Sequence, residues 1–151
     1  MDNSDLIDLL NHLVSTCKDG EYGFRSCTEH VKSENLRSVF SARAEECRQG
    51  AAELQSLIQQ NGGKPDDGGT ATGAVHRGWV AVKGTLTGYS DLAMLEECER
   101  GEDAALERYR KALEEPLPPE ARLVVARQYE GVKRNHLQVR TLRDEARAAA
   151  T

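Results

Sequence analysis

Apolar residues recur at helical spacing in four long segments of this sequence, and that pattern constrains its fold more than any other feature. The segments run from about Ser4 to Ser33, Glu34 to Gln60, Asp91 to Leu113 and Pro119 to Ala148. At 3.6 residues per turn, spacings of three and four place apolar side chains on one face of each helix. The pattern predicts an all-α fold of four amphipathic helices in a single domain, residues 1–151.

Composition excludes two classes of partner. The 20 Lys and Arg residues are scattered among 25 Asp and Glu, with no long basic run and a net charge of -5. Such a chain is expected to bind neither nucleic acid nor a membrane surface. The acidic start, MDNSDLIDLL, lacks the basic residues and cleavage site of a signal peptide. We therefore expect a cytoplasmic protein.

The lengths of the connections predict how the helices are arranged. Only a residue or two separates helices one and two, and a proline-rich break at residues 115–119 separates helices three and four, so each pair should form an antiparallel hairpin. The connection from Asn61 to Tyr89 is long enough to traverse the bundle, which lets helices two and three run parallel. Within it, Val75, Trp79, Val82 and Leu86 predict a short crossover helix, with Trp79 as a packed anchor.

A repeated motif places carboxylates in the middle of two helices. The pattern C-x-x-G-E occurs at residues 17–21 and again at residues 98–102, which suggests that one αα-hairpin has been used twice. Both glutamates, Glu21 and Glu102, fall within apolar faces, where an unpaired charge is costly. Arg43, Tyr109, Tyr129 and Gln128 lie near the same faces and are candidates to satisfy them. The mid-helix glycines predict close approach of the helices at that level.

Four blocks in order resemble a bacterial ferritin-like four-helix-bundle family known as a domain of unknown function. They are AAELQSLIQQNGGKP, AVHRGWVAVKGTLTG, LEECERGEDAALERYRKAL and LPPEARLVVARQ, and the resemblance covers most of the chain from Phe40 onward. It implies a ferritin-like bundle of two αα-hairpins with the crossover helix between helices two and three. It brings no established activity, and similar small bundles suggest a bacterial stress response.

The ligands of a ferritin-like di-iron centre are incomplete in this sequence. Such a centre takes a glutamate from each of two helices and a Glu-x-x-His motif from each of the other two. Glu21 and Glu102 match the first requirement, but helices two and four offer no inward Glu-x-x-His, and Lys133 stands three residues before His136. We therefore favour a structural or protein-interaction role over an enzyme, with no cofactor expected.

A metal-binding or redox-active bundle is the alternative. Its candidate ligands are inward carboxylate, imidazole and thiol groups, which would bind iron, manganese or zinc: Glu21, Glu102, His136, Cys17, Cys47 and Cys98. The competing interpretation of the cysteines is that they fill the core as small hydrophobic residues. Cys27 falls at the edge of its stripe and is expected to be partly exposed.

Two leucines predict self-association. Leu123 and Leu137 lie on the face of helix four opposite its inward stripe. Exposed leucines of this kind can mark a partner surface. A homo-oligomer is the expected assembly.

Overall fold

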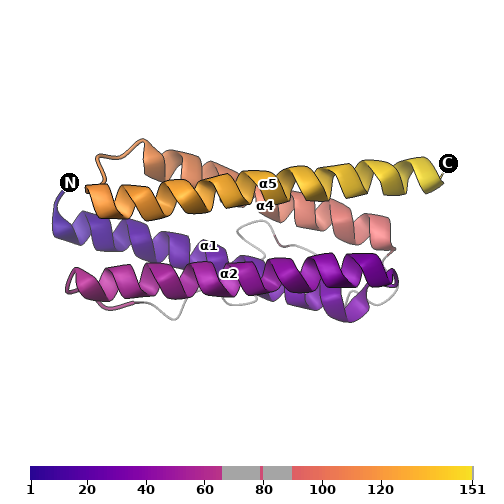
Figure 1. The fold of residues 1–151 in the computed structure, drawn as a ribbon, viewed down its shortest axis with the longest axis horizontal. Coiled ribbons are helices and arrows are strands. Elements are labelled where there is room, and N and C mark those ends of the chain that lie inside the picture. Colours follow the sequence, from indigo (N-terminus) through magenta and orange to yellow (C-terminus); the bar gives the residue numbers. More distant parts are fainter. Residues whose placement is uncertain (66–78, 80–89, 151) are drawn as a thin grey trace.

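The computed structural model of the chain describes residues 1–65, 79 and 90–150, and these residues form a bundle of four α-helices (Figure 1). The helices are α1 (Asn3–His30), α2 (Glu34–Gln60), α4 (Asp91–Leu113) and α5 (Pro119–Ala150). The described residues contain no strand, and the predicted all-α four-helix fold is confirmed. The predicted crossover helix lies outside the described residues, with the exception of Trp79.

The first helix differs slightly at both ends from the segment predicted for it. Its N-cap is Asp2, whose Oδ1 accepts a hydrogen bond from the backbone N–H of Asp5 at 2.8 Å, and Ser4 lies within the first turn. It ends at His30, because Ser33 is instead the N-cap of α2. A carboxylate or hydroxyl at the N-cap satisfies one of the N–H groups that the first turn leaves unpaired.

The end of α2 and the start of α4 lie at the stop and cap residues that the sequence predicts. Gly62, directly after the C-cap of α2, has φ +79, a left-handed conformation that glycine adopts without a steric penalty. Ser90 caps α4 by accepting a hydrogen bond from the N–H of Ala93 at 3.0 Å. Turn chemistry that is readable in the sequence therefore fixes the exit from α2 and the entry to α4.

The two hairpins lie side by side, and α2 and α4 run in the same direction, as predicted (Figure 1). Hydrogen bonds support this arrangement at one end of the bundle. The backbone N–H groups of Lys32 and Ser33, which precede α2, donate to the carboxylate of Asp91 at 2.9 and 3.0 Å. The starts of α2 and α4 therefore lie together, which a ferritin-like crossover requires.

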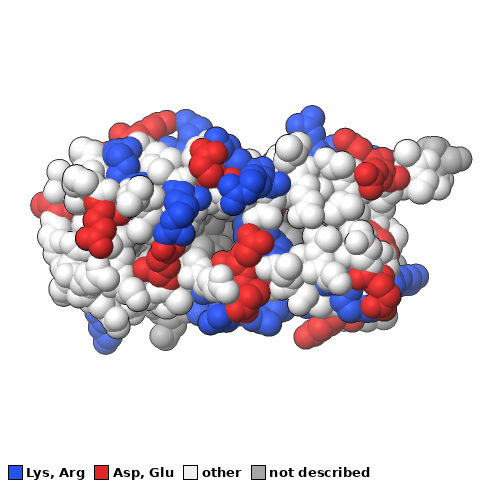
Figure 2. Space-filling model, in the orientation of Figure 1, with Lys and Arg blue, Asp and Glu red and all other residues white. Residues whose placement is uncertain are grey.

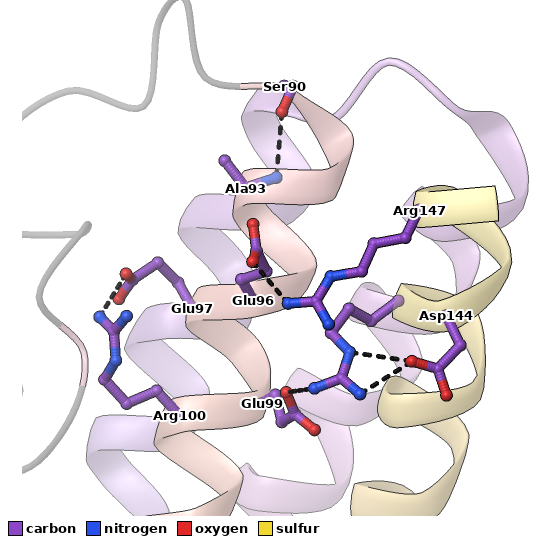
Figure 3. Close-up of polar contacts among 9 residues, drawn as sticks. Ser90, Ala93, Glu96, Glu97, Glu99, Arg100, Asp144 and Arg147 are labelled. Atoms are coloured by element: carbon purple, nitrogen blue, oxygen red, sulfur yellow. Dashed lines mark hydrogen bonds and ion pairs between the residues drawn. The ribbon is translucent and has the colours of Figure 1, made fainter. Parts of the chain in front are cut away.

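Charged side chains join α4 to α5 along the second hairpin (Figure 3). Arg147 Nη2 lies 2.8 Å from Glu96 Oε2, and Arg143 contacts both Glu99 and Asp144. Partly exposed pairs of this kind contribute about 0–1 kcal/mol each, so they fix register more than they stabilise the bundle.

The apolar core fills both ends of the bundle and thins out at its middle. Helix α1 packs mainly on α2, and α4 on α5, whereas α2 and α5 contact each other least among the helix pairs that touch. The bundle is therefore most open between α2 and α5. None of the described helices is long and apolar enough to span a membrane. The buried apolar residues at one end include Leu10, Val14, Leu54, Ile58 and Val125, and those at the other include Phe24, Phe40, Met94, Leu95 and Val139.

Candidate functional site

The centre of the bundle holds a buried ion pair. Glu102, in the middle of α4, is 2% exposed, and Arg43 on α2 is 9% exposed. Arg43 Nε lies 2.6 Å from Glu102 Oε1, and Arg43 Nη2 lies 3.3 Å from Oε2. The planar guanidinium thus binds the carboxylate through two parallel N–H groups, the geometry in which this pair is strongest. Arg43, one of the partners predicted for the inward carboxylate, occupies that role.

Neighbouring groups hold Arg43 in its charged form. Burial alone would lower the pKa of its guanidinium, but the negative charges of Glu102 and Glu46 outweigh burial, and the pKa is raised above its ordinary value. Arg43 Nη1 lies 3.6 Å from Glu46 Oε2, and the guanidinium carbon stands 5.7 Å from the centroid of the Phe24 ring. Arg43 is therefore a fixed cation with carboxylates on two sides and an aromatic face beside it.

A series of hydrogen-bonded side chains lies beside the ion pair and extends from the core to the surface. Cys17 Sγ lies 3.2 Å from Tyr109 Oη, and Tyr109 Oη donates to Gln128 Oε1 at 2.7 Å. Gln128 Nε2 donates to the carbonyl of Gly50 at 3.2 Å and to Glu53 Oε1 at 2.8 Å. Because both of those partners are acceptors, the amide orientation of Gln128 is fixed, and its oxygen must face the tyrosine.

The donor and acceptor roles in this series of hydrogen bonds show that Cys17 keeps its proton. Tyr109 has a single hydroxyl proton, which it donates to Gln128, so Cys17 must donate its own S–H to the tyrosine oxygen. Burial raises the pKa of the Cys17 thiol from its ordinary 9.0 to about 11, although the bond to Tyr109 acts in the opposite direction. Cys17 is therefore a neutral thiol at neutral pH, and a neutral thiol is a poor metal ligand.

A cavity of about 500 Å³ lies between the ion pair and this hydrogen-bonded chain. It opens where α2 and α5 diverge, and Figure 2 shows a hollow on that face, with Lys, Arg, Asp and Glu side chains around it. Arg127 and Arg134 of α5 line it, together with Glu46 and Glu53 of α2. Arg127 is ion-paired with Glu53. Charges at the mouth of the hollow are therefore of both signs and partly paired, which gives no selectivity for a ligand of either sign.

Trp79 enters the middle of the bundle between α1 and α4. A Cβ atom added at Gly23 would lie 2.2 Å from Trp79 Cε3, and one added at Gly101 would lie 2.2 Å from Cε2. The indole is 3% exposed and meets the Phe24 ring edge-on, with 4.9 Å between the centroids. Two glycines on facing helices thus form a slot for one aromatic side chain, and the predicted anchoring role of Trp79 is confirmed.

The sequence suggested that the mid-helix glycines let helix backbones approach closely. In the structure these glycines instead make room for side chains. Gly20 makes room for the Cys47 thiol, whose Sγ would lie 2.8 Å from an added Cβ. Gly50 faces Cys17 Sγ at 3.3 Å in the same way, so Cys17 and Cys47 each lie against a glycine of the facing helix. The glycines therefore accommodate side chains, including the indole at Gly101.

A sequence profile described as "Domain of unknown function (DUF2383)" matches residues 5–115. This is more than half of the chain. The chain belongs to the DUF2383 family. No curated protein matches it in sequence.

Solved structures place this DUF2383 chain in the ferritin-like fold. A dodecameric thioferritin, the bacterioferritin-related protein of Bacteroides fragilis, superimposes with a TM-score of 0.81 at 18% identity, covering 99% of this chain and 91% of that one. A C-terminal deletion mutant of Mycobacterium smegmatis Dps gives 0.77 at 21% identity, with 92% and 98% covered. Vibrio cholerae Dps gives 0.77 at 13% identity, with 93% and 89% covered. At these identities the likeness shows the fold alone.

The DUF2383 bundle does not gather its sequence-predicted carboxylates and histidine at one point. Glu21 lies near the surface of α1, where Arg25 Nη2 binds it at 2.9 Å, and it is not among the residues that line the central cavity. His136 Nε2 contacts the Asp103 carboxylate, and His136 is not among the residues that line the central cavity. Of the two inward carboxylates predicted, only Glu102 is at the centre.

The four cysteines are all free thiols and all buried, but they fall in different places. Cys17 and Cys47 line the central cavity. Cys98 instead contacts Cys27, with 3.7 Å between the two Sγ atoms. The expectation that Cys27 is partly exposed is wrong, since it is 1% exposed. Within the part of the chain that the structure describes, no three His, Cys, Asp or Glu side chains are placed to hold a metal ion.

Two parts of the site were missed by sequence reasoning. The role of Gly23 in the indole slot was missed because predicting it requires two facts that one helix does not show. These are the register of α1 against α4 and the position of Trp79, which comes from the connection between α2 and α4. The Cys27–Cys98 contact was missed because Cys27 falls at the edge of its helical stripe, and only the packing of α1 against α4 brings it to Cys98. A glycine one turn before Cys27 and another one turn after Cys98 were the available signals.

Proposed function

We propose that this ferritin-like bundle works without a di-iron centre and serves as a structural or protein-interaction protein. The observation that carries the proposal is the Arg43–Glu102 pair. In a di-iron bundle, cations at the centre are metal ions held by inward glutamates and histidines. Here a guanidinium supplies the positive charge that the buried carboxylate of Glu102 requires.

The remaining donors support the same interpretation, because the residues present do not fit a di-iron centre. Other polar groups that line the central cavity are a thiol, a tyrosine and a glutamine, which already bond to one another. Hard divalent ions prefer carboxylate and imidazole ligands. The alternative, a metal-binding or redox-active bundle using Glu21, Glu102, His136 and the thiols, would need Glu21 and His136 to leave Arg25 and Asp103.

Self-association is the second part of the proposal. Leu123 and Leu137 are 71% and 62% exposed and share one face of α5, although large apolar side chains are usually buried. The thioferritin of similar fold is described as dodecameric. We place the assembly in the bacterial cytoplasm, in a stress context, in line with the family resemblance.

Elemental analysis tests the proposal directly. The protein should be purified without chelators and without a histidine tag, and its iron, manganese and zinc measured per chain. The proposal expects each metal far below one equivalent. One or more equivalents of iron or manganese would contradict it and favour the metal-binding alternative.

A further inference from the structure

The thiols of Cys27 and Cys98 are in direct contact in the folded bundle. Cys27 belongs to α1 and Cys98 to α4, and the two residues are 1% and 0% exposed. Their Sγ atoms lie 3.7 Å apart, which is van der Waals contact, although the residues are separated by 71 positions in the chain. Cys17 instead bonds to Tyr109, and Cys47 packs against Gly20.

This contact differs from ordinary packing of small apolar side chains. Two thiols that already touch need only a modest side-chain rotation to reach the S–S bond length of about 2 Å. The folded bundle also holds them at a high effective concentration, since both helices are fixed by their own hairpins. Folding therefore favours a bond between these two sulfur atoms.

We propose that Cys27 and Cys98 form a reversible disulfide that links the first hairpin to the second. The reactant is a small-molecule disulfide. The thiolate of one cysteine attacks it, forming a mixed disulfide and releasing one small thiol, and the second cysteine then displaces the other. The two protein thiols lose two electrons and two protons, and the two released thiols receive them. The inference is independent of the proposed function.

Because both sulfur atoms are buried, the exchange proceeds through local opening of the contact between α1 and α4. A buried thiol does not react until water and the reagent reach it. Oxidation is therefore slow in the folded protein but selective once it occurs. The bond closes a loop of 71 residues, so the oxidised protein is the more stable form.

Trp79 is a built-in reporter for this site. It is the single tryptophan of the chain. Its ring contacts Gly23, one turn before Cys27, and Gly101, one turn after Cys98. Residues one turn apart share a helix face, so the indole lies next to the thiol pair. A disulfide formed there quenches indole fluorescence at short range.

The experiment equilibrates the protein with mixtures of reduced and oxidised glutathione. One sample starts folded, and another is refolded from denaturant in the same mixture, so that access to the thiols does not limit the outcome. Peptide mapping without reduction identifies the bonds formed. We expect the Cys27–Cys98 disulfide as the main product of both samples, lower Trp79 fluorescence, and a melting temperature raised on the order of 10 °C.

Matched variants show which cysteines cause the shift in melting temperature. The double variant Cys17→Ala/Cys47→Ala keeps the pair and should oxidise like wild type, whereas Cys98→Ala should show no oxidised form with a raised melting temperature. The inference is overturned if the refolded protein pairs other cysteines, or if all four remain reduced or carry only glutathione. It is also overturned if the double variant loses the shift in melting temperature.

Discussion

Arg43 Nε lies 2.6 Å from Glu102 Oε1, and this bond connects the two hairpins at the centre of the bundle. Arg43 belongs to the first hairpin and Glu102 to the second, so the pair spans the interface on which the fold depends. Both charges are removed from water, and each relies on the other for compensation. This mutual dependence makes the pair the most informative place to perturb the protein.

Removing the cation alone should be costly. Arg43→Met leaves the carboxylate of Glu102 buried without a partner, and breaking a buried pair in this way destabilises a protein by about 3–5 kcal/mol. Chemical denaturation of wild type and variant gives the difference. The control is Arg110→Met, which removes an exposed arginine that is also ion-paired, and it should change stability little.

Removing both charges should recover most of that loss. The double variant Arg43→Met/Glu102→Leu replaces the ion pair by apolar side chains of similar volume, an exchange that is often neutral or stabilising by about 1–4 kcal/mol relative to the intact pair. The measured coupling between the two sites reports their interaction. Additive effects of the two single changes would show that the pair does not act as a unit.

The indole slot predicts opposite effects for two glycine substitutions. Gly101→Ala places a Cβ atom 2.2 Å from the Trp79 ring, so the indole must move and its fluorescence should shift to longer wavelength as water reaches it. Gly131→Ala meets nothing nearer than the end of the Arg134 side chain, at 3.6 Å. It should stabilise α5 by up to about 1 kcal/mol through helix propensity. Equal stability of the two variants would contradict the slot.

The sequence predicts the four helices of the bundle better than it predicts the side-chain contacts at the centre. The helical stripes, the Ser90 cap and the Gly62 stop are local signals, and the structure confirms the helices that they predict. The proposed convergence of Glu21 with Glu102 rested on equal positions in two copies of one motif. Equal positions do not fix the rotation of each helix about its axis, and α1 turns Glu21 toward Arg25 and solvent.

Contacts between side chains from distant segments are the part that the sequence left open. Arg43 was one of several partners suggested for the inward carboxylates, because arginine, tyrosine and glutamine all lay near the right faces. The choice among them depends on how far each side chain reaches across the centre of the bundle, since α2 and α4 do not pack directly on each other. The same limit applies to Cys27, whose burial depends on Cys98 from a helix 71 residues away.

Alkaline pH should weaken the fold partly through Cys17. Burial raises the pKa of its thiol from 9.0 to about 11, so this share of stability is fully present below pH 9 and is lost as pH rises toward 11. The loss is on the order of 2–3 kcal/mol, because the unfolded chain then ionises while the folded one does not. Urea unfolding at pH 8 and pH 11 measures it.

The matched variant for this prediction is Cys17→Ser, which keeps a donor to Tyr109 but does not titrate in this range. Its stability should fall less than that of wild type over the same pH interval. Burial is the largest cause of the raised pKa values of Tyr109 and Cys47, and the variant keeps both groups buried. Identical losses of stability in wild type and Cys17→Ser would show that Cys17 ionisation does not weaken the fold.

The exposed leucines of α5 predict which surface mediates assembly. Leu123→Glu and Leu137→Glu together should shift the protein toward monomer, because burying two carboxylates in an apolar contact is unfavourable. Light scattering coupled to gel filtration measures the mass. Ser56→Glu, a charge placed at an exposed position of α2, away from these leucines, is the control and should leave the mass unchanged. A monomeric wild type at high concentration would exclude the assembly.

Thermal melting with added metal ions tests the central claim most directly. A ligand that binds only the folded state raises the melting temperature by mass action. If the Arg43–Glu102 pair occupies the centre in place of metal, neither Fe²⁺ under anaerobic conditions, nor Mn²⁺, nor Zn²⁺ should raise the melting temperature of wild type or of Glu102→Gln. A metal-dependent rise in wild type that disappears in Glu102→Gln would contradict the account.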